Sequence, residues 1–189
     1  MGRWLRAGGA LGLAAALGAC SLLAGEPERP KPPPVPDDQA PLEWARGEEY
    51  FVWIRRSCRT LSIYHRGEWI RTYRHVAFGR APGAKHARGD KRTPVGLYRI
   101  VRRYRHPRWS RFLLLDYPNL NDREDHRRAY AAGRAPPSAG GAIGIHGSDE
   151  PILNETGTDW TLGCISLFNR DVEELSDLVP DGTLVLIED

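Results

Sequence analysis

The sequence predicts a mainly β domain with two short helices, preceded by an N-terminal segment of different composition. Three observations support this prediction. Short runs of β-branched and aromatic residues recur between Gly- and Pro-containing turns, only two segments have helical composition, and seven of the fifteen prolines fall between Glu26 and Pro41. With 189 residues, 41% of them hydrophobic, the chain is long enough for one domain with its own core.

Residues 1–19 have the pattern of an export signal. Arg3 and Arg6 precede an uncharged run of Ala, Leu and Gly that is too short to span a bilayer. The run ends in Leu17-Gly18-Ala19-Cys20, which resembles the lipobox of bacterial lipoproteins. The resemblance implies cleavage before Cys20 and acylation of that cysteine. The alternative is an ordinary secretory signal with a coincidental Cys20.

Residues 20–44 form a predicted linker between the acylated cysteine and the domain. The proline-rich stretch cannot bury a core and favours an extended polyproline conformation, which suits a spacer. A lipid anchor followed by a spacer predicts an exported domain, residues 45–189, that works in the periplasm and is attached to a membrane through the lipid alone. Ser21 is compatible with sorting to the outer membrane.

The strand candidates follow one another through the domain, separated by turn residues. The predicted strands are Tyr50–Ile54, Leu61–His65, Trp69–Tyr73, Leu97–Tyr104, Phe112–Asp116, Ala142–Ile145, Ile165–Phe168 and Thr183–Ile187. The turn at His65–Glu68 predicts a hairpin between the second and third of these strands. The segment Val76–Gly79 is expected to extend the second arm of that hairpin.

Two segments are predicted to be helices. Asn121–Ala132 is mostly polar, contains alanines and no proline, and is expected to be exposed. Asn169 is expected to cap the second helix, which Pro180 and Gly182 would end. The apolar face of this helix consists of Val172, Leu175, Leu178 and Val179.

Charge is unevenly distributed along the domain. From Arg80 to Arg111 there are eleven Lys or Arg and one acidic residue, whereas from Asp149 to Asp189 there are eleven Asp or Glu and one basic residue. The basic segment could hold an anionic substrate, or the two segments could neutralise each other on a solvated surface; we favour the second interpretation. No nucleic-acid-binding motif accompanies the arginines, so no nucleic-acid partner is expected.

The predicted chemistry depends on His146 and Cys164, eighteen residues apart. A thiol requires a base to become a nucleophile, and the pKa of histidine suits that role near neutrality. Glycine follows the histidine and precedes the cysteine, which allows close backbone approach. The backbone N–H groups of Leu162, Gly163 and Cys164 are candidate oxyanion donors. A backbone carbonyl near Gly147 is the expected group to orient the imidazole.

Two alternatives compete with catalysis. One is a buried strand cysteine with an unrelated histidine, and the other is a zinc site, for which the paired ligands are missing. We therefore expect no metal and no cofactor, and we assign Asp149, Glu150 and Asp159 to a solvated acidic face. Cys58 is expected to be a structural thiol without a disulfide to Cys164.

The context of the two residues resembles a known family. His146-Gly147 and, after fourteen residues that follow the histidine, Thr161-Leu162-Gly163-Cys164-Ile165 resemble the L,D-transpeptidase catalytic domain, also called the YkuD domain. Thr93-Pro94-Val95-Gly96 resembles the T-P-x-G segment upstream in that family. The resemblance covers about residues 50–189 and implies the family's β-sandwich or barrel-like fold.

The resemblance also implies roles for single residues. Cys164 matches the nucleophile and His146 the general base, with Gly147 beside it. Gly163 matches the glycine of the oxyanion loop, and Thr161 the small hydroxyl residue before it.

Two further positions of the motif depart from the family. Leu162 replaces the usual His or Asn, and Ser166 replaces an Arg that would suit a substrate carboxylate. Both positions remain candidates for substrate binding. The run from Asp159 to Ile165 is more similar to the short YafK-type branch of the family.

Members of this family act on peptidoglycan stem peptides. Their cysteine attacks the carbonyl of the L-centre of diaminopimelate, releases D-alanine and passes the acyl group to an amine, which cross-links stems or attaches a lipoprotein. In the YafK-type branch, water can instead resolve the thioester and detach a wall-linked lipoprotein. The resemblance thus implies an enzyme of cell-wall organisation and cell shape that carbapenems would acylate at Cys164. A hydrolase of the same fold and a non-catalytic wall-binding lipoprotein are the alternatives.

Overall fold

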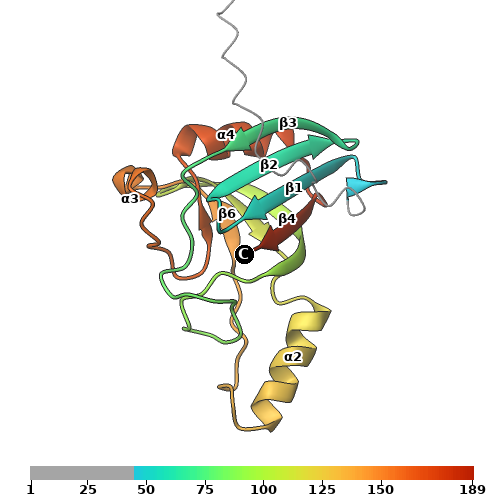
Figure 1. Ribbon diagram of the computed structural model, residues 1–189, viewed down its shortest axis with the longest axis vertical. Coiled ribbons are helices and arrows are strands. Elements are labelled where there is room, and N and C mark those ends of the chain that lie inside the picture. Colours follow the sequence, from blue (N-terminus) through green and yellow to red (C-terminus); the bar gives the residue numbers. More distant parts are fainter. Residues whose placement is uncertain (1–44) are drawn as a thin grey trace, which may run out of the picture. The chain divides into compact units, whose positions relative to one another are not determined.

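The computed structural model describes residues 45–189, and its β-strands form a curled sheet (Figure 1). Eight strands follow the order β3-β2-β1-β8-β4-β5-β6-β7. The strands are β1 (Tyr50–Arg55), β2 (Thr60–His65), β3 (Glu68–Tyr73), β4 (Gly96–His106), β5 (Ser110–Leu115), β6 (Gly144–His146), β7 (Ile165–Ser166) and β8 (Leu184–Glu188). The pairs β1–β8 and β6–β7 are parallel and the other pairs are antiparallel. The predicted mainly β fold is confirmed.

The helices of the described part are α2 (Leu120–Ala131), α3 (Pro151–Glu155) and α4 (Asn169–Leu178). The sequence predicted α2 and α4, whereas α3 was missed. Five residues that begin with proline are too few to show a helical period, so α3 has no clear signal in the sequence.

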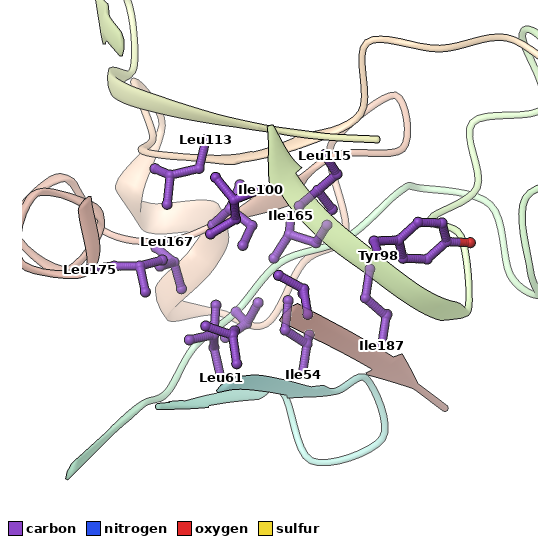
Figure 2. Close-up of a cluster of buried hydrophobic side chains, with 14 of the residues drawn as sticks. Ile54, Leu61, Tyr98, Ile100, Leu113, Leu115, Ile165, Leu167, Leu175 and Ile187 are labelled. Atoms are coloured by element: carbon purple, nitrogen blue, oxygen red, sulfur yellow. The ribbon is translucent and has the colours of Figure 1, made fainter. Parts of the chain in front are cut away.

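The main core contains side chains from all eight strands and from α4 (Figure 2). Alternation along β1 explains how one strand serves two clusters. Val52 and Ile54 point into this core, while Phe51 and Trp53 join a second cluster with Leu184 and Leu186 of β8. Each fully buried aliphatic side chain of this kind stabilises the fold by roughly 1.5–3 kcal/mol. The apolar strand runs in the sequence are therefore the segments that form the core.

Helix α2 lies apart from the sheet and buries no residue, as its polar sequence predicted (Figure 1). It begins with a capping box. The Asn119 side chain accepts hydrogen bonds from the backbone N–H groups of Asn121 and Asp122 at 2.9 and 3.2 Å, and Asp122 accepts one from the Asn119 N–H at 2.9 Å.

Helix α4 has the predicted apolar face, with Val172 and Leu175 fully buried. The predicted cap is wrong. Asn169 is the first helical residue, Phe168 occupies the cap position, and no side chain caps the helix. The Asn169 side chain instead accepts a hydrogen bond from the N–H of Ser148 at 2.9 Å, so this residue supports the segment after β6.

The segment Val76–Gly79 does not extend β3, and this prediction is also wrong. After Tyr73 the chain turns at His75, which has a positive φ of 60°. Ala77 then bridges Ser166 and Gly79 bridges Thr161. The segment therefore lies beside the Cys164 loop rather than along the hairpin.

The predictions for residues 1–44 lie outside the described part of the chain. They concern the export signal, the acylated Cys20 and the proline-rich linker. Within residues 45–189, no helix combines the length and apolar character that crossing a bilayer requires.

Candidate active site

The pairing of β6 with β7 brings His146, the last residue of β6, next to the strand that follows Cys164. In their parallel pairing, Ile145 lies opposite Ile165 and His146 lies opposite Ser166. Cys164 directly precedes β7, two residues before Ser166. Side chains two residues apart on a strand share a face, and so do in-register partners. The pairing therefore directs His146 and Ser166 to the same side of the sheet, and it places Cys164 at the start of the strand next to His146.

The imidazole of His146 is held by aromatic rings and a backbone carbonyl. It is 1% exposed, with its ring 4.2 Å from that of Trp109 in a stacked arrangement and 5.8 Å from that of Trp160, edge to face. Its Nδ1 lies 2.6 Å from the carbonyl oxygen of Gly147. Because a carbonyl oxygen can only accept, Nδ1 carries the proton and Nε2 of the neutral ring is free to receive one.

Burial keeps this histidine uncharged. Burial lowers the pKa of His146 to about 4, although the bond to the Gly147 carbonyl acts in the opposite direction. The ring is therefore neutral near pH 7, the state that a general base needs.

Close backbone approach explains the glycine at position 147. Its N–H donates to the carbonyl oxygen of Trp109 at 3.0 Å. A Cβ on Gly147 would lie 2.1 Å from Oδ1 of Asn169 and 2.6 Å from that Trp109 oxygen. Any larger residue would displace the carbonyl that contacts His146.

The thiol of Cys164 is partly exposed and lies 3.6 Å from the carbonyl oxygen of Ala142. Burial raises the pKa of the Cys164 thiol, while the backbone amide of Gly144 and the charge of Lys85 act to lower it. The cysteine is therefore a thiol at neutral pH. Both Cys164 and His146 are therefore uncharged near pH 7.

The loop before Cys164 has a strained and internally bonded conformation. Gly163 has φ of 132°, and a Cβ there would lie 2.6 Å from the carbonyl oxygen of Arg92. The hydroxyl of Thr161 accepts a hydrogen bond from the Gly163 N–H at 3.0 Å and donates one to the Cys164 carbonyl at 2.7 Å. Of the three backbone N–H groups predicted as oxyanion donors, that of Gly163 therefore already has an acceptor, the Thr161 hydroxyl. Those of Leu162 and Cys164 have no acceptor among residues 45–189.

Ser166 is fully buried behind the site. Its hydroxyl lies 3.3 Å from Oδ1 of Asn154 and 3.5 Å from the carbonyl oxygen of Gly147. Asn154 also donates to the Ser166 carbonyl at 2.9 Å and accepts a hydrogen bond from the Trp160 indole at 3.1 Å. Helix α3 therefore connects β7 to the tryptophan that contacts His146.

A cavity of about 750 Å³ opens beside the thiol. We call it the Cys164 cavity. Its lining consists of Arg80, Lys85, Arg88, Gly89, Lys91, Ser138, Gly140, Gly141, Ala142, Ile143, Leu162 and Cys164. Leu162 is 65% exposed at its rim, whereas Ser166 does not reach it. Of the two positions that depart from the family motif, only Leu162 can touch a molecule in this cavity.

Several residues that support the site were not predicted from the sequence. Trp109 lies in the turn between β4 and β5, and no spacing links it to His146. Asn154 also carries no recognisable signal, and Asn169 was predicted only as a helix cap. Trp160 lies in the run from Asp159 to Ile165, and this was the one indication in the sequence that it belongs to the site.

The described residues contain no cluster of three or more His, Cys, Asp or Glu that could hold a metal ion. Cys58 and Cys164 are both free thiols, and Cys58 is exposed between β1 and β2.

Comparison with known proteins gives a match to one family model and to a curated relative. The family model described as the L,D-transpeptidase catalytic domain matches residues 49–187. A curated protein of Bacillus licheniformis with the provisional name L,D-transpeptidase YkuD is 28% identical over 144 residues. That alignment covers 73% of this chain and 65% of the relative.

Solved structures share the fold. The helical cell shape determining protein Pgp2 of Campylobacter jejuni, in its K307A form, superposes with a TM-score of 0.56 and 25% identity, covering 75% of this chain and 47% of that one. An L,D-transpeptidase of Mycobacterium smegmatis gives a TM-score of 0.51 at 13% identity, covering 76% and 60%. The chain thus spans about half to two thirds of the length of these relatives. By its family match and its fold, the chain belongs to the L,D-transpeptidase catalytic domain (YkuD) family.

Proposed function

We propose that the chain is a peptidoglycan L,D-transpeptidase in which Cys164 forms a thioester with the stem peptide. The main support is the placement of the two side chains. A partly exposed thiol borders a cavity, and a neutral imidazole with its Nδ1 proton fixed by Gly147 lies on the adjacent strand.

The proposed reaction begins with two uncharged groups. Cys164 Sγ attacks the carbonyl carbon at the L-centre of diaminopimelate while Nε2 of His146 takes the thiol proton. The carbon–nitrogen bond to D-alanine then breaks, and the imidazolium returns the proton to the leaving amine. An acceptor amine resolves the thioester and regenerates the thiol.

The negative charge on the carbonyl oxygen needs donors at the same place. The backbone N–H groups of Leu162 and Cys164 are suited to this because no acceptor in the described residues uses them. We assign Gly163 and Thr161 a different task, since their mutual hydrogen bond holds the loop in shape.

Similarity to a cell shape determining protein supports action on the cell wall. Acylation at Cys20 would tether the domain to a membrane, and the proline-rich linker would let it reach stem peptides in the periplasm. A lipoprotein is a further partner in this proposal: its lysine amine would be the acceptor when it is attached to the wall and the leaving group when it is detached.

Incubation with defined muropeptides, followed by mass spectrometry, tests the proposal. The chain is expected to release D-alanine and yield a cross-linked dimer when an acceptor amine is present. Release of D-alanine without dimer would indicate a hydrolase instead of a transferase, because water and not an amine would then resolve the thioester. Unchanged activity in Cys164→Ala would exclude both enzymes.

A further inference from the structure

The position where the family motif carries an arginine cannot contact a substrate in this chain. Ser166 is fully buried, and its hydroxyl faces Asn154 and the Gly147 carbonyl. It is absent from the lining of the Cys164 cavity. A positive charge that binds a substrate carboxylate must therefore come from another segment of the chain.

The Cys164 cavity contains such charges. Four basic residues line it, and no Asp or Glu does. One of the four, Lys85, is already paired: its side chain is 4% exposed and donates to Asp90 at 2.8 Å and to the Ala87 carbonyl at 3.0 Å. The other three, Arg80, Arg88 and Lys91, are exposed, and their side chains have no hydrogen bond or ion pair with any residue of the described part.

Some neighbours of these three cations in the basic segment are paired with carboxylates. Arg99, Arg103 and Arg108 lie further along that segment, and each pairs with an acidic residue. Only the last two reach the acidic C-terminal segment, at Asp181 and Asp149. Mutual neutralisation of the basic and acidic segments, the interpretation that we favoured from the sequence, is therefore limited to these pairs. It leaves Arg80, Arg88 and Lys91 unpaired within the described residues.

Backbone hydrogen bonds hold the three cations around the thiol. The N–H of Arg80 donates to the Thr161 carbonyl at 3.1 Å, and that of Arg88 donates to the Ser138 carbonyl at 2.8 Å. The carbonyl of Lys91 accepts from the Ala81 N–H at 3.0 Å. The segments that carry the charges are thus bonded to one another and to the loop before Cys164.

We propose that Arg80, Arg88 and Lys91 form a carboxylate-binding site for the donor peptide, in place of an arginine at position 166. The identity of the donor rests on the proposed function. A stem peptide that ends in D-alanine carries free carboxylates on the γ-linked D-glutamate, on the D-centre of diaminopimelate and on the leaving D-alanine, and the last two flank the reacting carbonyl. Unpaired guanidinium and ammonium groups form charge-assisted hydrogen bonds with such groups. The site therefore selects free-acid donors over amidated ones.

Binding to an inactive chain tests this without catalysis. The full-length chain with Cys20→Ser and Cys164→Ala is titrated in a calorimeter with L-Ala-γ-D-Glu-meso-diaminopimelyl-D-Ala. The comparison peptide has both the D-alanine carboxylate and the D-centre carboxylate amidated. We expect the free-acid peptide to bind at least about tenfold more tightly, since charge-assisted hydrogen bonds of this strength change Kd by that factor or more. Equal Kd values, or no binding of either peptide, would overturn the proposal.

Variants identify the residues responsible. Arg80→Gln with Lys91→Gln is expected to remove most of the tenfold preference and to leave the affinity for the amidated peptide unchanged. Arg102→Gln is the matched control, because Arg102 is an exposed arginine of the same basic segment outside the cavity. If the preference for the free-acid peptide survives the double substitution, or falls equally in Arg102→Gln, the selectivity does not come from Arg80 and Lys91. The two-peptide comparison on the chain without cavity substitutions decides the matter even if the double variant folds poorly.

The same peptides separate this proposal from the proposed function. With Cys164 intact, a thioester that forms at the same rate on both peptides leaves acyl transfer standing and removes the carboxylate site. Selective binding of the free-acid peptide without any thioester supports the carboxylate site and contradicts acyl transfer.

Discussion

At the scale of single residues, the resting state of His146 and Cys164 determines how the site reacts. Burial lowers the pKa of His146 to about 4 and raises that of Cys164, so both groups are neutral near pH 7. The alternative for a cysteine enzyme is a thiolate–imidazolium ion pair, which needs shifts in the opposite directions. In the proposed reaction, formation of the nucleophile is therefore coupled to proton transfer during attack.

Titration of the thiol checks this resting state. In the full-length chain with Cys20→Ser and Cys58→Ser, Cys164 is the one remaining cysteine. We expect its thiolate absorbance to appear with a midpoint above the ordinary cysteine pKa of about 8.5. A midpoint below pH 7 would instead indicate an ion pair and contradict the neutral resting state.

The buried histidine also makes stability depend on pH. An unfolded histidine has a pKa of 6.5, whereas that of folded His146 is about 4, so the unfolded state binds more protons between these values. The free energy of unfolding should therefore fall by roughly 3 kcal/mol as the pH is lowered from 6.5 to 4. Urea titrations across this range measure it, with His146→Gln as the reference. An identical pH dependence in the two proteins would show that His146 is not buried in its neutral form.

At the scale of elements, α3 and β7 explain why Ser166 replaces an arginine. Asn154 of α3 is fully buried and bonds the side chain and carbonyl of Ser166 as well as the indole of Trp160. This network occupies the space that a long side chain at position 166 would need. The substitution is thus part of the packing beneath the site.

Restoring the arginine should therefore fail. Ser166→Arg is expected to destabilise the protein by about 3 kcal/mol or more, because it buries an unpaired charge and displaces Asn154. Ser166→Ala should cost about 1 kcal/mol, the value of the lost hydrogen bonds. Chemical denaturation measures both variants. Stability unchanged in Ser166→Arg, with a gain of activity, would show that the side chain can reach the cavity.

Elements with a strong local pattern were predictable, and elements that depend on distant partners were not. The strands Tyr50–Arg55 and Leu184–Glu188 are recognisable as continuous apolar runs because both of their faces are buried. The position of Val76–Gly79 depends on its bridges to the Cys164 loop, about 85 residues later, and no local sequence pattern encodes such a contact. Asn169 satisfies the sequence rule for a cap, yet the N–H of Ser148 competes for its side chain.

At the scale of the whole molecule, the curled sheet brings distant segments to the thiol. The β6–β7 pairing places His146 beside the strand that follows Cys164. The basic loop after Gly79 lines the Cys164 cavity. The two candidate catalytic residues could be proposed from the sequence because the motif around them is local. The cations and Trp109 were not, since only the folded chain places them near that motif.

Intact-protein mass spectrometry tests the central claim, that Cys164 forms an acyl-enzyme with a stem peptide. The full-length chain with Cys20→Ser is incubated with the diaminopimelate tetrapeptide, and the adduct is mapped by proteolysis. We predict a mass increase equal to the donor minus D-alanine, located on Cys164. It should be absent in Cys164→Ala and form roughly 10²- to 10⁴-fold more slowly in His146→Gln, the usual contribution of a general base. No adduct, or an adduct that persists in Cys164→Ala, would contradict the account.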